Sequence, residues 1–137
     1  MARAELVQAI DGLSEAKLTE PSLDGWSVKD HLAHLAQWHE VRYLDTLRLA
    51  AGKQSAVNST PEQDELFNQV TAGWRRPLSL EQVMWELATS RQRVLDAVAA
   101  LGSEGLERAL QKEWPLRTGH ESEHAGYIRL WRQSQGI

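Results

Sequence analysis

The sequence predicts an all-α fold, a four-helix bundle with a split or kinked third element. Apolar residues recur at helical spacing in several long segments, and capping residues, proline or glycine bound each of these segments. No segment shows the alternation expected of a strand of any length. A chain of 137 residues suits a single domain spanning 1–137, with one sizeable hydrophobic core.

The first helix is expected over residues 2–16, because the apolar residues there recur with helical spacing. Gly12 weakens the far end of this helix. Pro21 and the pair Asp24-Gly25 then predict a turn-rich connection to the next helix.

A long second helix is expected to begin after Ser27, whose hydroxyl can accept from the amide of Asp30, and to end at Gly52. One stripe of this helix should face the core: Val28, Leu32, Leu35 and His39. Its adjoining flank carries three further rings: His31, His34 and Trp38. Three charged residues are expected near solvent: Glu40, Arg42 and Arg48.

Capping residues predict where the remaining helices begin. Residues 60–63 combine an N-cap, a proline at the first helical position and a glutamine able to close a capping box, and the helix should end at about 73–77. Ser79 repeats the capping signal for a helix to Leu101, so the two pieces are expected to stack as one broken helix. Residues 106–110 predict one helical turn, and a capping box over 118–121 predicts a last helix to about Gln133.

Composition excludes several classes of function. The formal net charge of −4 provides no basic surface for nucleic acid or for an anionic membrane. Cysteine is absent, so a metal would need His, Asp or Glu as ligands. The N-terminus lacks the apolar core of a signal peptide, and no apolar run approaches the ~20 residues that span a bilayer. We expect a soluble, cytoplasmic protein. The six tryptophans are expected to anchor the core and interfaces.

The five histidines fall in two places, which predicts a metal site. His120 and His124 are four residues apart on a helix, so their β-carbons lie roughly 5–6 Å apart and both imidazoles can reach one ion. The other histidines, His31, His34 and His39, lie in the second helix, and a fold that joins the two segments would supply a third ligand.

Two stretches resemble one known family. GWSVKDHLAHLAQW, followed about ninety residues later by HxxEHxxxIxxW, resembles the DinB/YfiT-like superfamily, and within it the DfsB or ClbR-like branch. The likeness covers nearly the whole chain, including SLEQVMWELATSRQRVLDAVAALGSEGL. The resemblance implies a four-helix bundle in which His34, His120 and His124 hold a divalent metal, commonly nickel or zinc.

The resemblance leaves the chemistry open. Three protein ligands leave a coordination position free, as in catalytic metal sites. Relatives are described as metal-dependent hydrolases, which would use water, or as S-transferases or isomerases that use bacillithiol, mycothiol or glutathione. We expect a thiol S-transferase with a small-molecule substrate, acting as a homodimer. The alternatives are a hydrolase and a non-catalytic, stress-related protein that binds a small molecule or a metal.

HESEH also satisfies the zincin pattern H-E-x-x-H, in which Glu121 would be the general base. No histidine or carboxylate residue follows His124, and the predicted fold lacks a sheet, so a zincin is disfavoured. Glu121 is instead assigned to the capping box with Thr118, with a residual role as a base left open. Four other residues are candidates to orient a ligand, to act as an acid or base, or to contact substrate: His31, His39, Glu123 and Tyr127.

Overall fold

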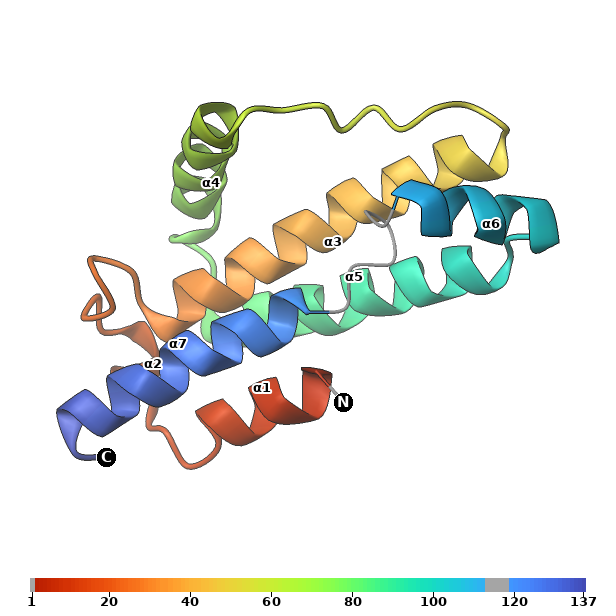
Figure 1. Ribbon diagram of the computed structural model, residues 1–137. Helices are drawn as coiled ribbons and strands as arrows, with labels where there is room; N and C mark the ends of the chain where they lie inside the picture. The colour runs from red at the N-terminus through yellow and green to blue at the C-terminus, as the bar shows by residue number, and fades with distance from the viewer. Residues whose placement is uncertain (1, 113–118) are drawn as a thin grey trace.

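The computed structural model describes residues 2–112 and 119–137, and these form an all-α bundle (Figure 1). The helices are α1 (Ala2–Ile10), α2 (Glu15–Thr19), α3 (Val28–Ala50), α4 (Pro61–Arg75), α5 (Leu80–Ala99), α6 (Ser103–Lys112) and α7 (His120–Gln135). None of the described residues belongs to a β-strand of a sheet. The predicted fold class is therefore confirmed.

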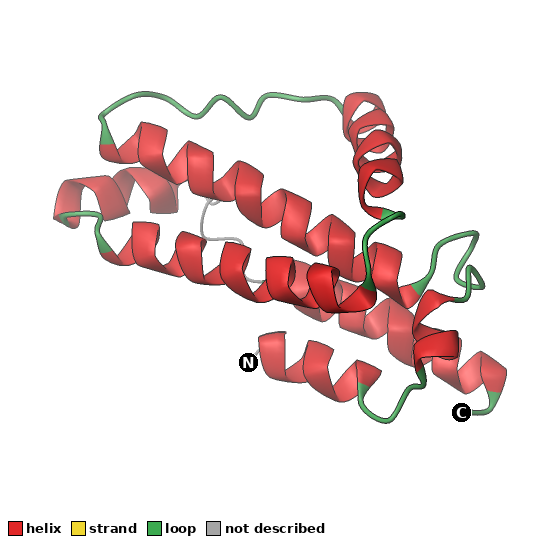
Figure 2. Cartoon of the chain, turned by 180° about the vertical axis from the view of Figure 1, so that it is seen from behind, coloured by secondary structure: helices red, strands yellow, loops and turns green. Residues whose placement is uncertain are grey.

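Four of these helices build the bundle. Helices α3 and α5 run side by side in the same direction, and α1 and α7 run side by side in the opposite direction (Figures 1 and 2). Because α3 and α5 are parallel, the chain must return along the bundle between them, and the segment that contains α4 makes that return. This arrangement places the start of α7 beside the middle of α3.

The predicted caps fix where the helices begin. Ser27 accepts from the backbone N–H of Asp30, and the Asp30 carboxylate accepts from the N–H of Ser27, which completes a capping box. Thr60 and Gln63 form the same reciprocal pair at the start of α4. Gly52 has φ +76°, the left-handed geometry expected just beyond the end of α3.

A single core cluster joins all four bundle helices. The predicted stripe of α3 is buried, with Val28, Leu32 and Leu35 fully inaccessible to solvent. The cluster consists of Leu6, Ala9, Val28, Leu32, Ala33, Leu35, Ala36, Val83, Leu87, Ala125, Ile128 and Trp131. Burial of this apolar surface is the main force that holds α1 and α7 against α3 and α5.

Two helices differ in extent from the prediction, and one predicted stacking of helices is absent. The first helix ends at Ile10, because Gly12 adopts φ +73° and the chain restarts at α2 after Ser14 caps it. α6 is a helix of 10 residues instead of a single turn. α4 and α5 do not stack as one broken helix, since α4 packs on α3 and stands across the direction of α5 (Figure 2). The third element is thus split, not merely kinked.

The tryptophans do not all lie in the core. Trp38 and Trp131 are buried, whereas Trp74 and Trp85 are more than 60% exposed, at 64% and 62%. Trp74 and Trp85 therefore do not anchor the core, and a role for them as interface anchors stays a prediction. Among the described residues, no helix has the length and the apolar character needed to cross a bilayer.

Candidate metal centre

Three histidines from two helices converge at one point inside the bundle. The Nε2 atom of His120 lies 3.1 Å from Nε2 of His34 and 3.2 Å from Nε2 of His124. All three residues are buried, and their candidate ligand atoms lie within 4.8 Å of one another. The structure therefore brings together the three histidines that the family resemblance selects.

The spacing of these nitrogens suits a metal ion. A tetrahedral ion with metal–nitrogen bonds of about 2.0–2.1 Å holds its ligand nitrogens roughly 3.3 Å apart. The two separations at His120, 3.1 and 3.2 Å, are close to that value. Imidazole nitrogens are common ligands of divalent transition metals, so the donor set and these two separations are compatible with metal binding.

His31 lies directly behind one of the three histidines. Its Nδ1 is 2.7 Å from Nδ1 of His124, so one ring donates to the other and the orientation of His124 is fixed. Burial lowers the pKa of His31 to about 4, although the nearby Asp30 opposes this shift. His31 is therefore neutral at pH 7 and able to accept a hydrogen bond from His124.

Arg42 was wrongly expected near solvent. It is buried, with 3% of its surface exposed, and its Nη2 lies 3.0 Å from Nδ1 of His120. A guanidinium only donates, so Nδ1 of His120 must accept and the proton of the neutral ring then resides on Nε2. Helical spacing places His34, Trp38 and Arg42 on one flank of α3, at intervals of four, but it does not identify His120 as the partner of Arg42.

Glu121 points away from the three histidines. Its carboxylate forms a two-point ion pair with Arg3 of α1, at 2.6 and 3.2 Å, and lies 3.3 Å from Nε2 of His39. Arg91 of α5 approaches it at 4.0 Å. α7 begins at His120 with no side-chain hydrogen bond at its N-cap, Gly119, so the predicted capping role of Glu121 is wrong. Thr118, its expected partner, lies outside the described residues.

Opposing effects set the pKa of Glu121. Burial raises the pKa, but hydrogen bonds from His39 and Arg3 and the positive charge of Arg3 outweigh it and lower the value to about 2. Burial also lowers the pKa of His39, against the effect of Glu121. Glu121 is thus a fully ionised carboxylate held by cations, which is a poor arrangement for a general base.

Glu123 and Tyr127 lie at the opening of the site. The Tyr127 hydroxyl donates to the Glu123 carboxylate over 2.8 Å, one helical turn away. The ring of Tyr127 packs edge-on against His124, with centroids 5.4 Å apart. Both side chains line a cavity of about 440 Å³ that reaches the imidazoles of His34, His120 and His124. Of the predicted candidates, these two therefore line the cavity that reaches the three histidines.

A tight turn before α3 forms another wall of this cavity. Leu23 and Trp26 exchange two backbone hydrogen bonds, 2.9 and 3.0 Å, around Asp24 and Gly25. These two residues have φ +53° and +87°, which is the geometry of a type I′ turn and suits an Asp-Gly pair. The turn holds the Trp26 ring edge-on to His34, with centroids 5.5 Å apart.

The fold and these histidines define a class of protein: an all-α bundle with a buried three-histidine cluster compatible with metal binding. The family model described as the DinB superfamily matches residues 1–128. The chain belongs to the DinB superfamily. No curated protein and no solved structure matches the sequence.

Proposed function

We propose that this protein is a metal-dependent enzyme of the thiol S-transferase type. His34, His120 and His124 would hold one divalent ion, nickel or zinc, and a low-molecular-weight thiol would be the cosubstrate. The observation that supports this proposal most is the convergence of three buried imidazoles, all within 4.8 Å, at the floor of a cavity of about 440 Å³.

The donor set suits a reaction that needs an open coordination position. A divalent ion held by three protein ligands lowers the pKa of a thiol that binds at its remaining position, and so supplies a thiolate near neutral pH. His31 fixes the ring of His124, and the ring of Trp26 packs edge-on against His31 and His34. Tyr127 brings a hydroxyl to the cavity wall, and by turning from Glu123 it would donate to a second substrate or to its leaving group.

The first experiment is metal analysis of the purified protein, followed by reloading with nickel or zinc. We expect close to one ion per chain in the wild type and none above trace in His34→Ala. The metal site would be ruled out if the wild type stays free of metal after reloading and its melting temperature does not change.

The second experiment measures activity of the loaded protein with a panel of low-molecular-weight thiols and an electrophilic acceptor. We expect thiol consumption by the wild type and none by His34→Ala. Full activity of the variant would rule this mechanism out. Binding of metal without any turnover would instead favour the non-catalytic alternative, a small-molecule or metal-binding protein.

Hydrolysis is the second candidate, and the carboxylates near the histidines favour it. Asp64, Glu65 and Glu123 line the same cavity, and a carboxylate there could accept a proton from an attacking water. This candidate predicts turnover of ester or amide substrates without added thiol, so omission of the thiol from the assay separates the two.

The expected homodimer stays a prediction. Leu66, Val70 and Trp74 form an exposed apolar stripe on α4, 67%, 45% and 64% accessible, which is a candidate contact surface. Sedimentation of the wild type and of Trp74→Glu would test this, because a dimer formed through the stripe should dissociate in the variant.

A further inference from the structure

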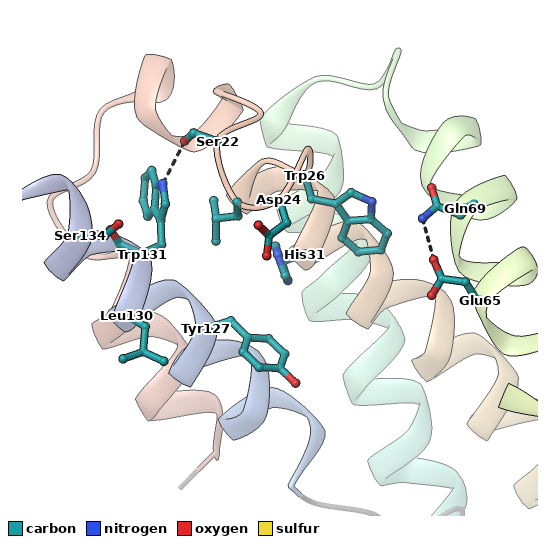
Figure 3. A pocket seen from close by; sticks show the side chains of 11 residues that line it. Ser22, Asp24, Trp26, His31, Glu65, Gln69, Tyr127, Leu130, Trp131 and Ser134 are labelled. Carbon is teal, nitrogen blue, oxygen red and sulfur yellow. Dashed lines mark hydrogen bonds between the residues drawn. The ribbon is translucent and has the colours of Figure 1, made fainter. Parts of the chain in front are cut away.

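A second cavity of about 600 Å³ adjoins the one above the histidines (Figure 3). Three residues line both cavities, namely Trp26, Glu65 and Tyr127. These side chains form a shared boundary, so a ligand of moderate length can occupy both spaces at once. A ligand that filled both spaces would therefore contact these three side chains.

The walls of this second cavity are partly apolar and firmly held. Trp131 donates from its indole nitrogen to the Ser22 hydroxyl over 2.9 Å, which fixes the ring at one end (Figure 3). Leu130 lines the same side, and Trp26 and Tyr127 supply two further rings. Such walls suit an aromatic or aliphatic group.

The charge in this cavity has one sign. Asp24 and Glu65 supply carboxylates, and no lysine or arginine is among the lining residues whose side chains the structure describes. Neither carboxylate forms an ion pair with a residue that the structure describes. The type I′ turn fixes the backbone of Asp24, and Figure 3 shows its side chain beside His31 at the cavity wall.

We propose that this cavity binds the positively charged end of an amphipathic substrate, an amine or guanidinium group carried on an aromatic or aliphatic body. The cation would lie between Asp24 and Glu65, close to the rings of Trp26 and Tyr127, which attract cations through their faces. The opposite end of the same substrate would reach the histidines. This proposal rests on the proposed function only for that opposite end.

An anionic substrate end fits this geometry poorly. It would meet Asp24 and Glu65 directly, and Asp64 and Glu123 line the adjoining cavity. Arg42 lines only the cavity above the histidines, where it already contacts His120. Like charges at short range oppose binding, so the two cavities together select against carboxylate-rich ligands at their outer end.

Two matched probes test this proposal on the metal-free protein: 2-phenylethylammonium and phenylacetate. Both carry a phenyl ring on a short chain, and they differ in the sign of their charge. Calorimetric titration should show that the ammonium probe binds about three- to tenfold more tightly than the carboxylate probe. Because neither probe has a thiol and no metal is present, a failed S-transfer assay leaves this test intact.

Single variants test which carboxylates cause the preference for the ammonium probe. Asp24→Asn keeps a residue that tolerates the left-handed geometry, and Glu65→Gln changes an exposed helical position, so both should fold. Each should lower the preference for the ammonium probe about two- to threefold. Glu62→Gln removes the same charge from an exposed position of α4 outside both cavities, and should leave the preference unchanged.

Three results would overturn the proposal. One is equal affinity of the wild type for the two probes. Another is a preference that survives in both Asp24→Asn and Glu65→Gln. The third is an equal loss in Glu62→Gln, which would assign the preference to the net charge of the whole protein.

Discussion

The first turn of α7 has two faces with opposite roles. His120 and His124 face α3 and an open cavity, and their imidazoles meet His34. Glu121, the next residue after His120, is turned about 100° around the helix, and its carboxylate is held by Arg3 of α1 and by His39 of α3. One face is suited to bind a ligand, and the other holds the bundle together.

This difference explains why a short motif misleads. The pattern H-E-x-x-H specifies that two imidazoles share a face and that the glutamate lies beside them, but the neighbouring helices decide what the glutamate meets. Here α1 brings Arg3 to Glu121, and the carboxylate is occupied with an ion pair. In a zincin the same position would meet a catalytic water.

Loss of a histidine from the cluster should have the largest effect. We expect His124→Ala to weaken binding of nickel or zinc by at least about 100-fold, because two imidazoles remain where three converged. Competition with a chelator of known affinity measures this. His39→Ala is the matched control, because His39 contacts Glu121 and not the three histidines. This variant should weaken metal binding by less than about tenfold. A similar loss of metal affinity in both variants would contradict the assignment of metal binding to the histidine face alone.

Removal of the charge of Glu121 should act mainly on stability. Glu121→Gln leaves Arg3 without its carboxylate and should lower the free energy of unfolding by about 1–3 kcal/mol, since Arg3 keeps partial access to water. Chemical denaturation of the metal-free protein measures this. Glu40→Gln, which breaks the exposed pair with Arg93, should cost at most about 1 kcal/mol. Equal costs would contradict a special role for the buried pair.

The ion pair between Glu121 and Arg3 should also make the stability of the protein depend on pH in the acid range. The pKa of Glu121 is lowered from 4.5 to about 2 in the folded protein, so the unfolded chain binds the proton more readily. The contribution of Glu121 to stability is thus complete above about pH 4.5 and is lost as the pH falls toward 2. Denaturation at a series of pH values should show a shallower decline over this window in Glu121→Gln than in the wild type. If the unfolding free energies of the wild type and Glu121→Gln fell in parallel over this pH window, the lowered pKa of Glu121 would be contradicted.

Removal of Arg42 should have the smallest effect and an opposite sign. Its guanidinium donates to Nδ1 of His120 and places a positive charge near the cluster, and both features oppose metal binding through Nε2. We therefore expect Arg42→Met to bind the metal more tightly, by up to about tenfold. The same chelator competition measures the change. Weaker binding would show that Arg42 supports His120 instead of competing with the ion.

Most of the fold was predictable because its signals are local. Ser27, Thr60 and Gly52 mark helix boundaries through their own side chains or backbone geometry, and these boundaries were confirmed. The stripe of α3 followed from helical spacing alone. The break after Ile10 was missed because Gly12 was treated as a weak helix former, whereas its left-handed geometry ends the helix.

The candidate site was predictable only in part. Two histidines four residues apart indicate that both lie on one face of a helix. The choice of His34 over His31 as the third ligand came from the family resemblance. Sequence alone does not assign Arg3 and Arg42 to solvent or core, because a long charged side chain can lie in either. Their partners, Glu121 and His120, are 118 and 78 residues away in the chain, so only tertiary structure identifies them.

The separation of His34 and His120 by 86 positions has a consequence for folding. A metal ion held by both would tether α3 to α7 and close a large loop in a chain that has no cysteine and therefore no disulfide. By analogy with a covalent cross-link of that span, the tether would restrict the unfolded ensemble by about 4–5 kcal/mol if it persisted there. Such an ion would then link the two ends of the chain within this bundle.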